Sequence, residues 1–194
     1  MRGDGFLEII ARKESFEEND YTSARIKTEG LFSTTNSRVE ARIKVPSGSG
    51  IWPAFWMLGD QFSEIGWPAC GEIDIMEIQG ESPNTLIGTV HGPGYSGGEG
   101  VGGSTIQIAP LSDDFHVYSV DNDPEHIVWS LDGKPYHTLS KGDLPPNSPW
   151  VFNDSFFLIL NIAVGGNFVS SPNDSTEFPS KMYIDYVKVY ERGL

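Results

Sequence analysis

The sequence predicts an all-β domain, a sandwich or barrel of short strands. Alternating or β-branched apolar runs recur along the chain, and Gly, Pro, Asn or Asp bounds them. The 22 Gly and 13 Pro are spread over the whole length, as expected where turns join many strands. No segment of helical length shows apolar residues at i, i+3, i+4 and i+7, which argues against a helical bundle.

The individual strands follow from this alternation and from the turn residues between the runs. Asp132-Gly133 predicts a tight hairpin turn between Ile127–Leu131 and Pro135–Leu139. The glycine-rich segment Gly92–Gly103 follows a strand, which suits a backbone passing close to a ligand, or a mobile loop. The other expected strands are Phe6–Ala11, Thr22–Glu29, Arg38–Val45, Glu72–Ile78, Thr85–Val90, Ser104–Ile108, His116–Val120, Phe156–Ala163 and Tyr183–Tyr190.

Residues 1–194 are expected to form a single domain. The chain is long enough for one well-buried core, and it contains no internal repeat and no linker. Cys70 is the only cysteine, so an intramolecular disulfide and a thiolate metal cage are excluded. The start of the chain has no apolar signal-peptide core, and no run approaches the roughly 20 residues of a membrane span.

The net charge of −14 limits the partners that the protein can bind. Nucleic acids and anionic membranes need clustered Lys and Arg, so neither is expected as a partner. Acidic polysaccharides are disfavoured for the same reason, whereas a neutral polymer meets no such repulsion. Acidity that serves solubility alone is the alternative interpretation.

Residues 71–80 carry three carboxylates in a strongly apolar strand, Gly-Glu-Ile-Asp-Ile-Met-Glu-Ile-Gln-Gly. Strand alternation places Glu72 and Asp74 on one face, but Glu77 falls on the other, apolar face. A lone buried carboxylate there would be costly. A β-bulge at Ile75–Met76 removes the conflict, because one extra residue returns Glu77 to the face of the other two acids.

Three carboxylates on one face repel one another and add nothing to stability, so they indicate chemistry. Solvated acids on an edge strand are the alternative, although the flanking Ile and Met favour a central strand. With the bulge, the carboxyl groups of Glu72 and Glu77 can approach the separation of about 5–5.5 Å that a retaining glycosidase needs. Asp74 between them would hold a proton or share a hydrogen bond and keep their pKa values apart.

The segment from Trp67 to Glu77, Trp-Pro-Ala-Cys-Gly-Glu-Ile-Asp-Ile-Met-Glu, resembles the signature of glycoside hydrolase family 16 in its laminarinase (endo-β-1,3-glucanase) branch. Met76 is the extra residue that separates this branch from the lichenase-like branch. The resemblance runs from about Gly5 to Tyr190. Other matching segments are Tyr21–Arg25, Gly50–Leu58, Asn161–Asn167 and Asp185–Tyr190.

The resemblance implies a jelly-roll sandwich of two bent antiparallel sheets, with a neutral β-glucan lying in the concave face. By position, Glu72 is the nucleophile, Glu77 the general acid/base and Asp74 the assisting residue. No cofactor is implied for the chemistry. A structural calcium on the convex face, to which Asp185 contributes, is implied, and an extracellular location follows from the class of substrate.

This chain departs from the family pattern in three places. Phe168 stands where the cleft normally has a Trp, which would weaken one subsite, and an aromatic residue usual near Asn122 is absent. Some tens of residues that normally precede the equivalent of Gly5 are also missing. Without them, we expect Met182–Tyr190 to be an unpaired apolar edge. The chain then either pairs this edge with a neighbouring copy or has a weakened fold with poor calcium binding and a shortened cleft.

Substrate binding is assigned mainly to aromatic residues, because sugar rings pack their apolar faces on indoles. Trp52 and Trp67 are expected in the cleft, whereas Trp56 fits the cleft and the core equally. His91 would lie beside Asp74 if the two strands pair. The candidate partners of sugar hydroxyls are Arg25, Asn36 and Asn161. Together with Phe168, they complete the set of binding candidates.

The sequence therefore predicts endo-acting hydrolysis of β-1,3 bonds in a laminarin-type glucan, by double displacement with retention. Mixed-linkage β-1,3-1,4-glucan or agarose hydrolysis on the same fold remains an alternative. A glucan-binding, lectin-like module is the alternative outside the enzymes, because a fold alone does not fix a function.

Overall fold

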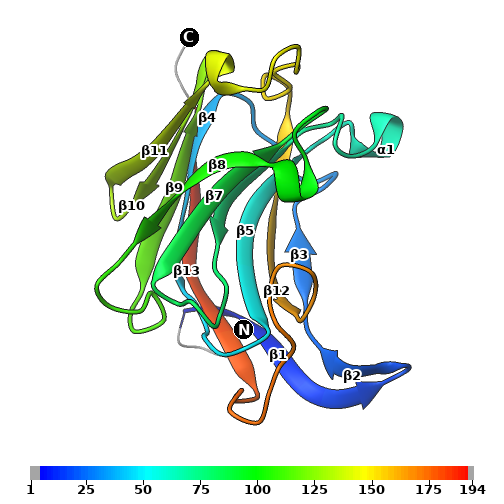
Figure 1. Ribbon diagram of the computed structural model, residues 1–194, viewed down its shortest axis with the longest axis vertical. Coiled ribbons are helices and arrows are strands. Elements are labelled where there is room, and N and C mark those ends of the chain that lie inside the picture. Colours follow the sequence, from blue (N-terminus) through cyan, green and yellow to red (C-terminus); the bar gives the residue numbers. More distant parts are fainter. Residues whose placement is uncertain (1–4, 192–194) are drawn as a thin grey trace.

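The computed structural model describes residues 5–191, which fold into two antiparallel sheets packed face to face (Figure 1). One sheet has seven strands in the order β11-β10-β9-β4-β13-β1-β2, and the other has six in the order β3-β12-β5-β6-β7-β8. The seven-stranded sheet consists of β1 (Leu7–Phe16), β2 (Asn19–Thr22), β4 (Ser37–Lys44), β9 (His116–Asn122), β10 (His126–Leu131), β11 (Lys134–Ser140) and β13 (Ser180–Glu191).

The six-stranded sheet carries the carboxylate strand near its centre. It consists of β3 (Arg25–Lys27), β5 (Ile51–Gly59), β6 (Glu72–Glu77), β7 (Thr85–His91), β8 (Val101–Ile106) and β12 (Phe156–Val164). Within residues 5–191, helical structure is limited to single turns, namely α1 (Phe62–Ile65), η1 (Gly97–Glu99) and η2 (Lys141–Asp143). The two-sheet sandwich expected from the sequence and from the family resemblance is confirmed.

The core lies between the two sheets, and strand alternation fills it. In β4 every second side chain is buried and its neighbours are partly exposed, so Val39, Ala41 and Ile43 point into the core. On β6, Ile73 and Ile75 do the same from the opposite sheet. This arrangement leaves the other face of the six-stranded sheet for the site.

The sequence-based boundaries need three corrections. The strand expected at Ser104–Ile108 is β8, which begins at Val101, inside the glycine-rich segment Gly92–Gly103, and ends at Ile106. Thr22–Glu29 is not one strand: β2 ends at Thr22 in one sheet and β3 begins at Arg25 in the other, so the chain changes sheets at Ser23–Ala24. A further strand, Ile51–Gly59, was not among the expected strands. It pairs with β12 on one side and with β6 on the other. The expected hairpin turn is confirmed, because Asp132 and Gly133 have φ values of 49° and 74° between paired Leu131 and Lys134.

The expectation of an unpaired edge over Met182–Tyr190 is wrong for its first part. Met182, Tyr183 and Ile184 pair with β1 on one side, and most of β13 pairs with β4 on the other. β1 takes this place because its alternating apolar residues extend the core of the sheet. Within residues 5–191, the part of β13 that has no strand on the β1 side is Asp185–Glu191.

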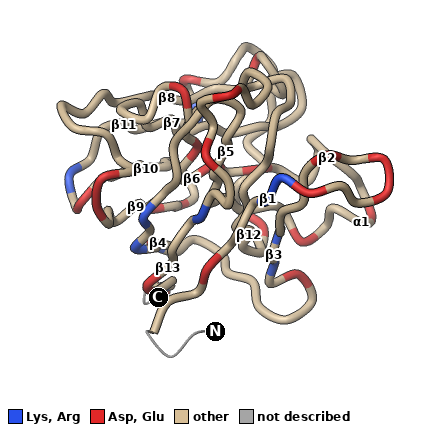
Figure 2. Tube along the Cα trace, turned by 90° about the horizontal axis from the view of Figure 1, so that it is seen from below, with Lys and Arg blue, Asp and Glu red and all other residues tan. Residues whose placement is uncertain are grey.

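The acidic residues are spread over the whole chain, in strands and loops alike, and outnumber the basic ones (Figure 2).

Among residues 5–191, no helix is long and apolar enough to cross a membrane.

Candidate active site

The carboxylate strand β6 contains the expected β-bulge. Against β5, Asp74 pairs with Trp56 and Met76 with Phe55, so Ile75 is the extra residue. Against β7, the register shifts between Asp74 and Glu77. Ile75 and Met76 are both fully buried in the core, 1% and 0% exposed. The bulge therefore turns Glu77 back to the face that carries Asp74, as the parity argument predicted.

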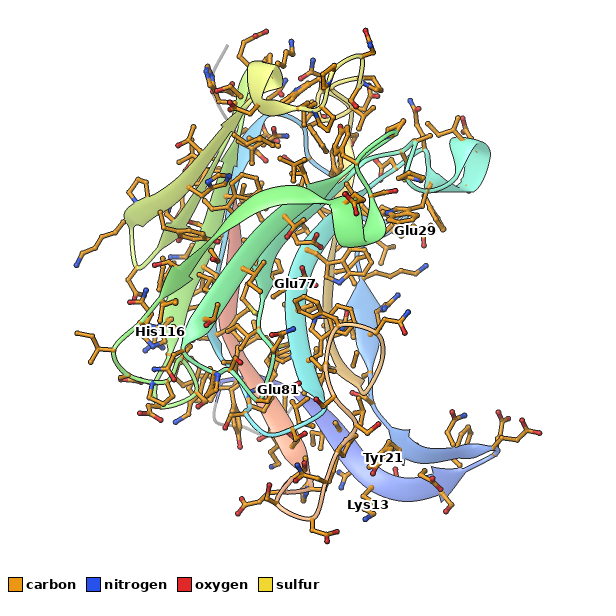
Figure 3. All side chains as sticks on the ribbon, viewed as in Figure 1. Lys13, Tyr21, Glu29, Glu77, Glu81 and His116 are labelled. Atoms are coloured by element: carbon orange, nitrogen blue, oxygen red, sulfur yellow. The ribbon has the colours of Figure 1, made fainter. Side chains whose placement is uncertain are left out.

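Glu72, Asp74 and Glu77 form one cluster at the centre of the six-stranded sheet, where Figure 3 places Glu77. Asp74 is 3% exposed and Glu77 is 9% exposed, whereas the Glu72 side chain keeps 17% of its surface. Asp74 and Glu72 share a side-chain hydrogen bond. Three carboxyl groups are thus held close together with little access to water.

This environment separates the protonation behaviour of the three acids. Burial, followed by the negative charge of Glu72, raises the pKa of Asp74 well above its usual range. Burial also raises the pKa of Glu77 well above its usual range, and negative charge on the neighbouring carboxyl groups adds to that rise. Burial raises the pKa of Glu72 too, but His91, Trp67, Asp74 and Arg25 each counteract that rise. Glu72 is therefore the acid best able to stay ionised.

His91, at the end of β7, joins the cluster as predicted. It pairs with Glu72 across the two strands, and its Nε2 lies 3.1 Å from Asp74 Oδ2 and 3.8 Å from Glu72 Oε1. Among the described residues, Glu72, Asp74 and His91 bring three potential metal-ligand atoms close together, and His91 is the only base of the three. His91 thus supports the ionised form of Glu72 and lies against Asp74.

A cavity of about 340 Å³ opens beside Glu72. Trp67 is 44% exposed, lines this cavity and contributes a hydrogen bond to Glu72. Trp56, which the sequence left undecided, lines the cavity too, and the Arg25 guanidinium lies over its ring at 5.2 Å from the centroid. The indole and guanidinium surfaces are suited to a neutral sugar ring.

Trp52 and Asn161 act through other residues of the site. Trp52 donates a hydrogen bond from Nε1 to Glu77 Oε1 at 3.1 Å, and its ring packs on Phe168 with centroids 4.9 Å apart. Asn161 is 5% exposed and accepts a hydrogen bond from Trp56 Nε1 at 2.8 Å. Asn161 therefore positions Trp56, while Phe168 still supports Trp52 in place of the family's Trp.

Two sequence-based candidates lie elsewhere. Asn36 does not line the cavity beside Glu72 but occupies a positive-φ position, 49°, just before β4. Asp185 Oδ2 accepts a hydrogen bond from Arg42 Nη1 at 2.8 Å. Within residues 5–191, no group of three His, Cys, Asp or Glu side chains gathers around Asp185. Among the described residues, Asp185 is therefore paired with Arg42 rather than grouped with further acids, and the calcium site that the resemblance implied stays a prediction.

Six residues that line the cavity were not among the candidates predicted from the sequence, namely Lys27, Glu29, Leu58, Phe62, Phe157 and Ile159. Lys27 and Glu29 follow Arg25 at spacings of two and four, so strand alternation places all three on one face. That spacing was a signal that could have found the two charged residues. Phe62 begins the single turn α1, and its local sequence gives no such signal.

Comparisons with known proteins agree with this geometry. The family model for glycosyl hydrolases family 16 matches residues 4–188. A laminarinase catalytic domain from Thermotoga maritima is 49% identical with a TM-score of 0.94, and the match covers 98% of this chain and 79% of that one. An endo-β-1,3-glucanase from Pyrococcus furiosus is 47% identical with a TM-score of 0.93, over 96% and 75% of the two chains.

Among curated sequences, a β-glucanase from Rhodothermus marinus is 42% identical over 97% of this chain and 68% of its own length. The match exceeds what a shared fold alone requires, and it includes the bulged strand with its three acids. The chain therefore belongs to glycosyl hydrolases family 16.

Proposed function

We propose that this chain hydrolyses internal β-1,3 bonds of a neutral glucan by a retaining double displacement. The observation that carries this function is the bulged strand β6, which directs Glu72, Asp74 and Glu77 to one face beside a Trp-lined cavity. The similar proteins support the linkage, since two of them are an endo-β-1,3-glucanase and a laminarinase. The chain is an enzyme, and its chemistry needs only side chains.

In the first step, the Glu72 carboxylate attacks the anomeric carbon, and the bond from that carbon to the leaving oxygen breaks. Glu77 gives its proton to that oxygen. The environments suit these roles: the raised pKa of Glu77 keeps it protonated, while His91 and Arg25 favour the charged form of Glu72. The product is a glycosyl ester on Glu72 and a shortened glucan.

In the second step, Glu77 acts as a base. Its carboxylate takes a proton from a water molecule, the water oxygen bonds to the anomeric carbon, and Glu72 leaves as a carboxylate. Asp74 is protonated because burial raises its pKa, so it donates its hydrogen bond to Glu72. It can strengthen that bond as charge returns to Glu72.

Product analysis on laminarin, lichenan, agarose and carrageenan tests this function. We expect the highest activity on laminarin, lower activity on lichenan and negligible activity on sulfated galactans, because the net charge of −14 repels an anionic polymer. Early products should be mixed oligosaccharides with a β-anomeric reducing end, as detected by proton NMR. A preference for carrageenan, or inversion at the anomeric carbon, would refute the proposal.

The proposal extends to location and assembly. A polymeric glucan substrate favours action outside the cell. The remaining open edge of β13, Asp185–Glu191, favours pairing with a second copy, although Lys188 on that edge weakens the tendency. Light scattering over a concentration series, with Val187→Lys as the control variant, tests the assembly. A monomer at every concentration would contradict it.

A further inference from the structure

Trp129 connects the seven-stranded sheet to the back of the catalytic strand. It lies on β10, is fully buried, and donates a hydrogen bond from Nε1 to the main-chain carbonyl oxygen of Asp74 at 2.8 Å. The indole therefore approaches β6 from the core, on the side opposite to the three carboxyl groups. It touches neither the cavity nor the reacting atoms.

The hydrogen bond falls on the residue where the bulge begins. Asp74 still pairs with Trp56 on one side and Thr89 on the other, but the register shifts on both sides directly after it. A bulge disrupts the ladder hydrogen bonds of a strand, and a buried carbonyl left without a donor is costly. The Trp129 indole is a donor at this point, so it stabilises the bulged backbone relative to a regular strand.

A slot formed by two glycines fixes the orientation of this indole. Gly88 on β7 and Gly103 on β8 are paired residues, opposite the paired residues Trp129 and His137 of β10 and β11. A Cβ at Gly88 would lie 2.4 Å from Trp129 Cδ1, and a Cβ at Gly103 would lie 2.4 Å from the His137 ring. The rings of Trp129 and His137 pack with centroids 5.4 Å apart. The absence of two side chains thus lets the indole reach β6.

We propose that Trp129 is a positioning residue for catalysis: its hydrogen bond to the Asp74 carbonyl holds the bulge that directs Glu77 into the cleft. A regular β6 would point Glu77 into the core, so the general acid depends on the bulge. The inference rests on the proposed function. Because misplacing a catalytic group by about 1 Å can cost about 10²-fold, we expect loss of the indole N–H to lower kcat by about 10–100-fold.

The test is Trp129→Phe, which keeps an aromatic ring and removes the donor. We expect kcat to fall with KM within about twofold of the parent, because the cavity residues are untouched. The fall should be largest for aryl glucosides with poor leaving groups, which need protonation by Glu77, and smallest for those with good ones. Titration with a slow covalent inactivator measures the concentration of active sites. Dividing the rate by this concentration gives a kcat that does not depend on how much of the variant is unfolded.

Phe152→Leu is the matched control, since Phe152 is an equally buried aromatic residue in the same core. It should lower the melting temperature without changing kcat or the leaving-group dependence. Gly88→Ala provides a second variant, in which a methyl group displaces the indole instead of removing its donor. If Trp129→Phe does not fold, Gly88→Ala is judged by the same criteria.

A folded variant of either kind with the parent's kcat and leaving-group dependence overturns the inference. Failure of the proposed function is seen separately. If the parent protein does not cleave laminarin, or if Glu72→Ala remains active on it, the function is wrong irrespective of what Trp129 does.

Discussion

The acidic residues on the outer faces of the two sheets behave in opposite ways. On the seven-stranded sheet, Arg38 binds Asp121 at 2.5 Å and Glu40 at 3.2 Å, and Arg42 binds Asp185 at 2.8 Å. On the six-stranded sheet, Asp74 and Glu77 are buried beside another carboxyl group, and burial raises their pKa values. Carboxylates are thus paired with arginine on the seven-stranded sheet, whereas those on the six-stranded sheet are buried beside one another.

The difference shows where the fold stabilises itself and where it keeps reactive groups. Ion pairs that are partly exposed contribute at most modestly to stability, and they leave no group ready to react. Buried acids without a full set of partners destabilise the folded chain but gain the raised pKa that proton transfer requires. The predictions below test this contrast, from the largest expected effect to the smallest.

Removing the reacting acids should have the largest effect. Glu72→Ala should abolish activity on every substrate, because no other group can form the glycosyl ester. Glu77→Ala should lose about 10²–10⁴-fold on laminarin, yet azide should restore turnover of substrates with good leaving groups. The measurement is the initial rate with and without azide.

Asp121→Ala on the other sheet is the control, and its kcat should match the parent's, because Asp121 contacts Arg38 and no cavity residue. Equal and mild losses from Glu72→Ala and Glu77→Ala would contradict the assignment of roles.

The pH dependence of kcat/KM should report the raised pKa of Glu77. A general acid must be protonated, so activity should fall as pH rises through the folded-state pKa. The Trp52 hydrogen bond lowers that pKa, so Trp52→Phe should move the alkaline limb to higher pH. An alkaline limb that stays in place, or that moves to lower pH, would show that Trp52 does not control this proton.

The sequence alone predicted the bulge because strand alternation left only two possibilities for Glu77. A regular β6 would bury Glu77 among Ile and Met, whereas a bulged β6 returns it to the face of Glu72 and Asp74. It also placed His91 and Trp67 correctly, since strand pairing and exposed aromatics follow local rules. It could not predict that Trp129 would support β6 from the other sheet, because that contact joins residues far apart in the chain. An isolated glycine within a strand, Gly88, was the only local sign of a close approach.

Stability should respond to Glu77 in the opposite direction from activity. Its folded-state pKa lies above the unfolded value of about 4.3, so ionisation favours the unfolded chain as pH rises between the two values. This destabilisation is complete above the folded-state pKa and absent below the unfolded one. Glu77→Gln should therefore raise the melting temperature by about 2–4 °C or more at pH 8 and by much less at pH 4. Calorimetry at both pH values decides, and a lower melting temperature at pH 8 would contradict it.

Breaking the ion pairs of the seven-stranded sheet should cost little. The Arg38 side chain is 30% exposed, so Arg38→Ala should lower the free energy of unfolding by at most about 1 kcal/mol. Its kcat should not change. Urea unfolding at low and high salt measures the effect, which should shrink as salt screens the pair. A loss of several kcal/mol, or a change in kcat, would contradict the view that these ion pairs contribute little to stability and nothing to the active site on the other sheet.

Calcium should have the smallest effect. A site that is filled at 100 times its Kd would stabilise the folded chain by about 2.7 kcal/mol, which a melting curve detects easily. The Asp185 carboxylate is instead bound by Arg42, whose positive charge opposes a nearby cation. Millimolar calcium should therefore leave the melting temperature unchanged relative to the same protein in a chelator. Arg42→Ala separates two reasons for that result: if it confers calcium stabilisation, Arg42 blocks a site that is otherwise present, and if it does not, the ligands are lacking. A strong rise in the melting temperature of the parent protein would show that Asp185 exchanges its arginine for the metal.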